Sequence, residues 1–296
     1  MFISIITNCY NSTATLERTY ESLVKQTVQN FEWVLVDDYS LDNGKTKELI
    51  LRLAKIAPFN VSYRFLEENH YGAKSTYTAC TIAKGDYSCI LDHDDELKPT
   101  AIDDAISYID KYKKNKEFVG ICGRCVNEKG VLIGEKFPFT EKISTESEIR
   151  FNYKNTSELF QFTRTDILKD AFSIMKRGYT NGFCWLSICQ SYKYVYVNDV
   201  FRIYDTAILT SHSNNKRINR TTIEGQLESL KYAINMQTKY FKYNYKYGLQ
   251  LLYQMLIYSI FSEGKSISHI MDIKPPYRFL LLLLYPMVLL KSLQYK

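Results

Sequence analysis

Strand-like and helix-like segments alternate through the first third of the chain. Four short runs rich in β-branched and apolar residues occur in FISIITNCYNS, FEWVLVDDYS, VSYRFLEEN and YSCILDHDD. Between them lie three stretches with helical spacing, at about 13–27, 43–57 and 74–83. Strands that are almost continuously apolar and separated by helices are typical of a parallel sheet covered on both faces. The sequence therefore predicts an α/β fold with a mostly parallel sheet.

Carboxylates follow two of these predicted strands. Asp37 and Asp38 end the second strand, and the acidic cluster 92–95 ends the fourth. In open α/β sheets, ligands bind at the carboxyl ends of the strands, so these groups are expected to converge on one crevice. An acidic turn that caps the helix beginning near Lys98 is the alternative interpretation of the second cluster.

The cluster Asp92, His93, Asp94 and Asp95 has the composition of a cation site. If the segment is extended, alternation places Asp92 and Asp94 on one side and directs His93 away, as a packing residue. Carboxylate oxygens are hard ligands that suit Mg²⁺ or Mn²⁺ carrying a diphosphate. The spacing thus predicts a divalent cation bound by Asp92 and Asp94.

Three motifs in order, SIITNCYN, FEWVLVDDYSLD and AKGDYSCILDHDDELKP, give the chain a recognisable likeness. Over about residues 2–215 it resembles the family 2 glycosyltransferases, which have the GT-A fold. The resemblance implies that Thr7, Tyr10 and Asp38 hold the uracil and ribose of a nucleotide-sugar. It also implies that Asp92 lies near the ribose and the metal, and that Asp94 binds the Mn²⁺ or Mg²⁺ that bridges the diphosphate.

A further element of the family, Asn-x-Gly-Lys, lies beside the nucleotide in those enzymes. Asn69, Gly72 and Lys74 resemble it, although extra residues lengthen the element here. Asn69 and Lys74 are accordingly expected at the donor site.

The middle of the chain, about 117–204, is expected to bind the acceptor. In relatives that resemble this segment, a Glu before the residue equivalent to Gly182 is the general base, but this chain has Asn181. An amide cannot take a proton at neutral pH. Glu158 and Asp205 are the two substitutes considered, and a weakly active or inactive protein is the third possibility. His212, in the loop LTSHSNNKR, is interpreted either as a group near the metal or diphosphate, or as a solvated loop residue.

Composition excludes several other classes. The net charge is +6, and no Arg-rich stripe interleaves with aromatics; KYFKYNYKYG at 239–248 comes closest, so nucleic acid is not an expected partner. Neither a Walker loop nor G-x-G-x-x-G is present. Seven cysteines, with no secretory signal before the first strand, favour a reduced cytoplasmic setting. Cys122 and Cys125 lack the second pair that a zinc site needs, and are interpreted as strand residues.

The sequence pattern becomes helical near residue 216, which divides the chain into a catalytic domain at 1–215 and a helical region at 216–296. The apolar run Phe279–Leu290 is 12 residues long and contains Pro286, whereas a membrane span needs about 20. Arg278 and Lys291 flank the run, which shows no polar face at residues 279–284. A membrane-surface anchor is favoured over internal packing or a dimer interface.

Taken together, the sequence predicts an inverting, metal-dependent glycosyltransferase on the inner, cytoplasmic face of the cell membrane. The expected donor is a UDP-linked sugar, and the expected acceptor is a saccharide, carried on polyprenyl diphosphate, in polysaccharide, O-antigen or capsule assembly. The alternative is a nucleotide-sugar-binding protein with weak or no transfer activity. A nucleotidyltransferase would carry a Gly-rich basic loop after the first strand, which TNCYNSTA does not provide.

Overall fold

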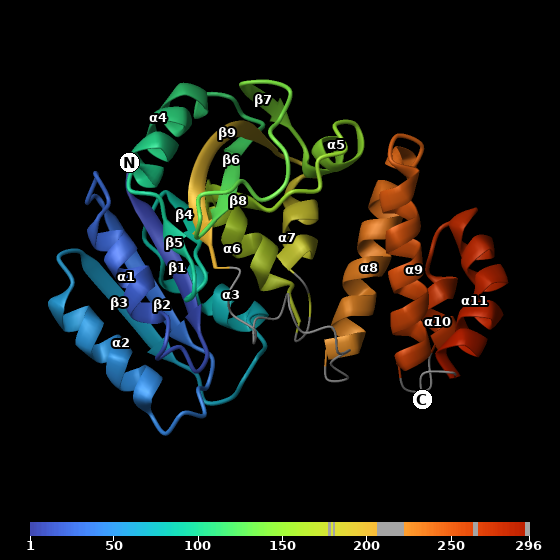
Figure 1. Ribbon diagram of the computed structural model, residues 1–296, viewed down its shortest axis with the longest axis horizontal. Coiled ribbons are helices and arrows are strands. Elements are labelled where there is room, and N and C mark those ends of the chain that lie inside the picture. The colour runs from blue at the N-terminus through green and yellow to red at the C-terminus, as the bar shows by residue number, and fades with distance from the viewer. Residues whose placement is uncertain (177–178, 180, 206–221, 263–265, 294–296) are drawn as a thin grey trace.

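A layered α/β unit and a group of C-terminal helices make up the structure (Figure 1). The computed structural model describes residues 1–176, 179, 181–205, 222–262 and 266–293. His212 therefore lies outside the described residues, as does the predicted domain boundary at 215.

Within the described residues, nine strands form one sheet in the order β3-β2-β1-β4-β8-β6-β9-β5, with β7 paired to β9. Its first four strands are the predicted ones, and they pair in parallel: β1 (Ile3–Cys9), β2 (Phe31–Asp37), β3 (Asn60–Phe65) and β4 (Tyr87–Ile90). The parallel half of the sheet is confirmed.

The other strands make the sheet mixed. Strand β8 (Leu159–Arg164) runs antiparallel between β4 and β6 (Phe118–Asn127), and β9 (Lys193–Tyr204) runs parallel to β6. Short strands β5 (Glu96–Leu97) and β7 (Glu141–Ser144) pair antiparallel with β9. Strand β9 is continuous, and register shifts in its pairing with β6 absorb a local irregularity.

Helices cover both faces of the sheet, as predicted. The sheet's apolar side chains divide into two core clusters. One packs on α1 (Leu16–Val24), α2 (Lys45–Ile56) and α4 (Ala101–Tyr112). The other packs on α3 (Ala73–Ile82), α5 (Glu146–Phe151), α6 (Thr165–Ser173) and α7 (Asn181–Ile188). Alternate strand residues thus face opposite layers, which is why β1, β2 and β6 are buried along almost their whole length, whereas edge strand β3 is partly exposed.

The segment that follows β6 forms only a short hairpin with it. The turn at 128–130 forms, but the returning segment makes a single bridge, Val126 to Leu132. Gly134 then adopts φ +87°, and a Cβ there would meet Ser157 Oγ at 2.0 Å. Cys122 and Cys125 are buried, free thiols in β6, in agreement with their interpretation as strand residues.

The C-terminal helices have a core of their own. They are α8 (Ile223–Gln237), the 3₁₀ turn η2 (Thr238–Tyr240), α9 (Tyr245–Phe261), α10 (Ser266–Met271) and α11 (Tyr277–Leu293). Phe151, at the end of α5, is buried in this core and stacks on Phe241 at a ring separation of 5.7 Å. The helices are therefore docked on the sheet domain and not joined to it by a linker alone.

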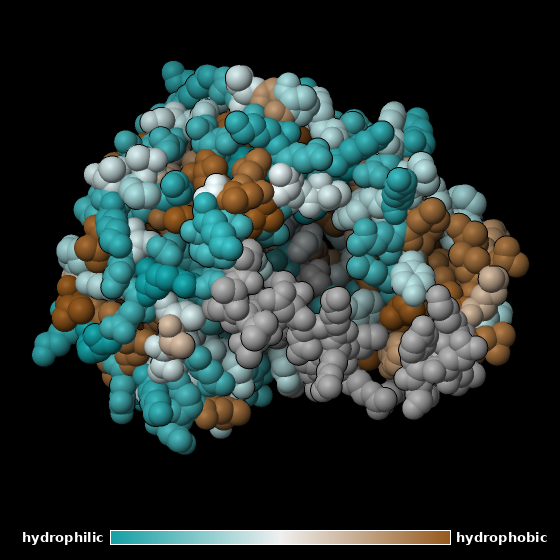
Figure 2. All heavy atoms as spheres, viewed as in Figure 1, coloured by the Kyte–Doolittle hydropathy of each residue, from teal (hydrophilic) through white to brown (hydrophobic). Residues whose placement is uncertain are grey.

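Helix α11 both packs internally and exposes an apolar face. Leu281 is fully buried, but four apolar residues at helical spacing are 65–73% exposed: Phe279, Leu283, Met287 and Leu290. The helix continues through Pro286, with Leu281, Leu284 and Val288 in the C-terminal core. Figure 2 shows apolar side chains gathered over the C-terminal helices at the right of the view. No helix in the described part of the chain combines the length and apolarity that crossing a membrane needs.

Candidate active site

The acidic cluster lies in a turn, which corrects the expectation of an extended segment. Strand β4 ends at Ile90, and the backbone amide of Asp95 donates to the carbonyl of Asp92 at 3.1 Å. Because the chain turns back, carboxylate oxygens of Asp92, Asp94 and Asp95 all lie within 4.8 Å of one another. Three carboxylates gather here, where strand alternation predicted two.

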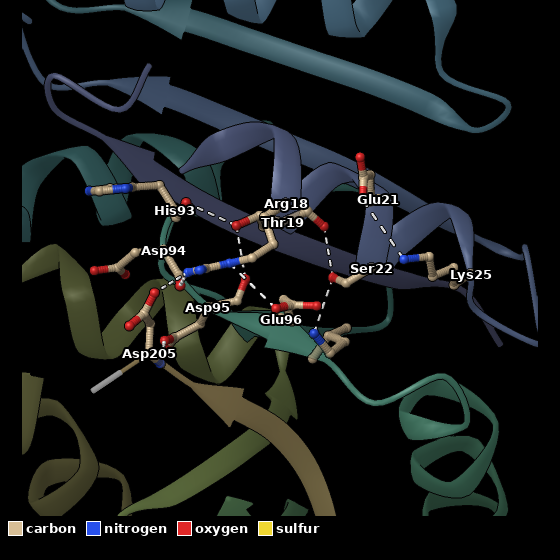
Figure 3. Close-up of polar contacts among 11 residues, drawn as sticks. Arg18, Thr19, Glu21, Ser22, Lys25, His93, Asp94, Asp95, Glu96 and Asp205 are labelled. Atoms are coloured by element: carbon tan, nitrogen blue, oxygen red, sulfur yellow. Dashed lines mark hydrogen bonds and ion pairs between the residues drawn. The ribbon is translucent and has the colours of Figure 1, made fainter. Parts of the chain in front are cut away.

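Helix α1 holds this turn from one side (Figure 3). The hydroxyl of Thr19 lies 2.9 Å and 2.8 Å from the carbonyl oxygens of His93 and Asp95. Arg18 donates to the carbonyl of Asp94 and to the carboxylate of Asp205. These contacts fix the turn's backbone and leave the Asp94 carboxylate outside the network drawn in Figure 3.

His93 lies away from the three carboxylates. Its Nδ1 is 2.9 Å from Thr15 Oγ1, just before α1 begins. His93 is partly exposed, and its interpretation as a packing residue stays a prediction.

A buried arginine holds the turn from the other side. Arg202, in β9, places Nη1 3.2 Å from Asp95 Oδ2 and 3.8 Å from Asp92 Oδ2, while its Nη2 lies 2.7 Å from Glu158 Oε1. Sequence reasoning missed both Arg18 and Arg202. A charged residue inside the otherwise apolar strand VFRIY was the available signal for Arg202, because a buried guanidinium needs acidic partners.

The electrostatics of the turn suit a divalent cation. Burial raises the pKa of Asp95 to about 8, against the opposing effect of Arg202 and with a further rise from Asp92. Asp95 Oδ2 is buried and, in the described part of the chain, accepts no hydrogen bond with good geometry. Three carboxylates whose oxygens lie within 4.8 Å of one another fit Mg²⁺ or Mn²⁺, which prefer such hard ligands.

Asp38 supports the neighbouring loop. The side chain is buried at the end of β2, and its two oxygens accept hydrogen bonds from the amides of His70 (2.8 Å) and Gly72 (2.9 Å). Asn69 Oδ1 accepts from the amide of Tyr71 at 2.9 Å within the same loop, and Lys74 is exposed in the first turn of α3. The stretched Asn-x-Gly-Lys element is thus anchored to the strand end by a carboxylate.

Thr7 and Tyr10 differ in their accessibility. Thr7 is fully buried in β1, and its hydroxyl accepts a hydrogen bond from Trp33 Nε1 at 2.9 Å. Tyr10 is exposed, one residue beyond the end of β1. Of these two expected donor contacts, only Tyr10 offers its side chain to solvent.

The three candidate positions for the base have different surroundings. Asn181 is exposed at the first residue of α7. The Asp205 side chain is only 8% exposed and pairs with Arg18 at 2.5 Å. The Glu158 side chain is 48% exposed and has one oxygen held by Arg202. Of the two carboxylates, Glu158 is the one that an acceptor can reach.

Comparison with known proteins gives one family match. The sequence model described as Glycosyl transferase family 2 matches residues 4–172. The poly(ribitol-phosphate) beta-N-acetylglucosaminyltransferase TarP of Staphylococcus aureus is 30% identical over 36% of this chain and 32% of its own length. The amylovoran biosynthesis glycosyltransferase AmsB of Erwinia amylovora is 28% identical over 36% of each chain. The chain spans only about a third of the length of these relatives.

Among solved structures, the S. aureus TarS 1–349 complex with UDP-GlcNAc has a similar fold. It superposes with a TM-score of 0.65 over 100% of this chain and 93% of that one, at 18% sequence identity. The likeness establishes the GT-A fold.

Proposed function

Because this chain belongs to glycosyltransferase family 2, we propose that it transfers a sugar from a UDP-linked donor to a saccharide acceptor during assembly of a cell-surface polysaccharide. The names of TarP and AmsB support a role in assembly of a cell-surface polysaccharide. The TarS complex with UDP-GlcNAc supports UDP as the nucleotide. The proposed acceptor is a growing saccharide on polyprenyl diphosphate.

One structural observation carries the proposal. The Asp38-anchored loop follows the sheet at β2, and the acidic turn follows it at β4, with only β1 between these strands. A nucleoside at the loop and a diphosphate at the acidic turn would therefore occupy one continuous edge of the sheet. That is the edge at which open α/β sheets bind ligands.

The acidic turn and the neighbouring loop would bind different parts of the donor. Asp94, with Asp92 and Asp95, would hold Mn²⁺ or Mg²⁺, which supplies Lewis-acid stabilisation of the departing diphosphate when bound. Tyr10, Asn69 and Lys74 would contact the nucleotide, with Asp38 keeping the loop in place. Thr7 is assigned a packing role because its hydroxyl is buried against Trp33.

We assign the general base to Glu158. Its partly exposed carboxylate lies in the same network as Asp92, and Arg202 orients one of its oxygens. The second oxygen would accept the proton of the acceptor hydroxyl as that hydroxyl attacks the anomeric carbon from the side opposite the diphosphate. The product would have inverted configuration.

The C-terminal helices are proposed to bind the inner surface of the cell membrane. Lys274 precedes α11 and Arg278 lies in its first turn, next in sequence to the exposed apolar residues, and exposed lysines at 239, 242 and 246 lie near the start of α9. Apolar side chains can enter the acyl boundary while cations meet anionic headgroups, which together give reversible attachment. This would bring the site to lipid-carried acceptors.

A panel of nucleotide-sugars tests the proposal. The purified chain is incubated with each donor and Mn²⁺, and release of the nucleoside diphosphate is followed. Release from one UDP-sugar supports the proposal, and release from none contradicts transfer. In that case, tight UDP-sugar binding by calorimetry would favour the second candidate, a binding protein without transferase activity, which Asn181 at the usual base position motivates.

A further inference from the structure

Arg202 is an internal cation in the acidic turn. Its side chain is 6% exposed, and it reaches three carboxylates on two separate parts of the chain: Asp92 and Asp95 after β4, and Glu158 before β8. The aromatic rings of Phe160 and Tyr204 enclose it, with the guanidinium carbon 5.5 Å and 4.9 Å from their centres. Its Nε has no hydrogen-bond partner within the described residues.

The position of Arg202 has an electrostatic consequence. Asp95 is buried and needs a positive charge beside it, so removal of Arg202 would leave its carboxylate uncompensated. A divalent cation on Asp92, Asp94 and Asp95 would use the oxygens that Arg202 Nη1 now faces. Two positive groups at one set of oxygens repel each other, so the two cannot both bind at full strength.

We propose that Arg202 is a positioning residue that balances the acidic turn before the cation binds and competes with the cation for Asp92 and Asp95. When the cation binds, Nη1 gives up the turn while Nη2 stays on Glu158. The donor site and Glu158 are then linked through one guanidinium. Binding of the cation would therefore change the position of the Arg202 charge relative to the Glu158 carboxylate. This inference rests on the proposed function for the identity of the site, but competition is measurable with the metal alone.

The test uses the full chain and Mn²⁺ without nucleotide. Arg202→Gln and Arg202→Lys are compared with wild type by calorimetric titration and by the melting temperature with and without Mn²⁺. Arg202→Gln is expected to melt lower than wild type without Mn²⁺. It should bind Mn²⁺ about tenfold more tightly, because the internal cation that competes for the same oxygens has been removed. Addition of Mn²⁺ should also raise its melting temperature by more than that of wild type. Arg202→Lys keeps the charge and should stay closer to wild type.

Arg124 provides the matched control. It is a fully buried arginine on β6, in register with Val200 of β9, but its contacts are Asn155 Oδ1, the Glu135 carbonyl and the Phe137 ring. Arg124→Gln should lower the melting temperature by the same amount with and without Mn²⁺. A purely structural Arg202 would behave in the same way.

Two results would overturn the inference. One is Mn²⁺ affinity in Arg202→Gln that equals or falls below that of wild type; if that variant does not fold, the same result in Arg202→Lys has the same meaning. The other is the absence of Mn²⁺ binding in every variant. Release of UDP by wild type is measured separately, so failure of competition and failure of the proposed transferase activity are distinguished.

Discussion

Asp38 Oδ2 accepts a hydrogen bond from the backbone amide of Gly72 at 2.9 Å, which ties the end of β2 to the loop that begins α3. The other oxygen accepts from the amide of His70 at 2.8 Å. Gly72 has φ +86°, a conformation that favours glycine, so the loop's shape depends on both the residue and the carboxylate. Asp38 therefore preorganises the loop at the proposed nucleoside site.

Replacement of Asp38 by alanine is expected to weaken donor binding through this loop. Two partly buried amide donors would lose their acceptor, at a cost of up to about 1–3 kcal/mol for a group left unsatisfied. Calorimetry with UDP and Mn²⁺ should show the weaker affinity, and hydrogen exchange should speed up at the amides of His70 and Gly72. Asp42→Ala is the control, because that carboxylate binds Thr46 in α2. Unchanged UDP affinity in Asp38→Ala would refute the role of the loop.

Glu158→Gln is predicted to lower kcat and to leave the KM for the donor nearly unchanged. General base catalysis contributes about 10²–10⁴-fold, and the amide keeps the shape of the side chain but cannot take the proton. Steady-state transfer assays measure both constants. Glu135→Gln, an exposed glutamate in the preceding loop, should have little effect. A kcat within a few-fold of wild type in Glu158→Gln would assign the base elsewhere.

Two glycines with similar backbone angles are predicted to differ in their tolerance of alanine. Gly134 and Gly130 have φ of +87° and +75°, but only the Cβ added at Gly134 meets Ser157, at 2.0 Å from Oγ. Backbone strain alone costs about 1–2 kcal/mol for alanine, and overpacking adds about 1–3 kcal/mol. Urea unfolding should therefore show a larger loss for Gly134→Ala than for Gly130→Ala. Equal losses would mean that the 155–158 segment moves aside freely.

The double variant Leu283→Lys with Met287→Lys is expected to release the protein from membranes without unfolding it. Both side chains are exposed on α11, so neither change empties the core, whereas deletion of the helix would also remove the buried Leu281. Co-sedimentation with vesicles containing anionic lipid measures attachment, and a melting curve checks the fold. Ile56→Lys, an exposed apolar position on α2, is the control. Undiminished sedimentation of the double variant would exclude this face as the membrane contact.

The parallel half of the sheet and its acidic edge could be predicted because their signals are local. Apolar runs mark β1 to β4, and strand ends fix where Asp38 and the acidic cluster lie. The arrangement inside the cluster could not be predicted, because the hydrogen bond from Asp95 to Asp92 and the contacts of Thr19 replace strand geometry with a turn.

Contacts between residues far apart in the sequence account for the other features that could not be predicted. Arg18 and Asp205 are separated by 187 positions, and Arg202 reaches Glu158 across 44. No periodicity encodes such pairs, and they depend on β9 lying beside β6 in the mixed half of the sheet. Likewise, burial of Phe151 among the C-terminal helices depends on tertiary packing, which the change in composition near residue 216 does not reveal.

Metal-dependent UDP release by Asp94→Asn tests the central claim most directly. With the best UDP-sugar of the panel, wild type should be active in Mn²⁺, inactive in EDTA and active again when Mn²⁺ is restored. Asp94→Asn should lose about 10²–10³-fold in rate in saturating Mn²⁺, because the carboxylate that holds the charge-stabilising cation is gone. Glu96→Gln, in the next segment and paired with Arg18, should stay near wild type. Activity of Asp94→Asn within a few-fold of wild type would contradict the assignment of the acidic turn as the catalytic metal site.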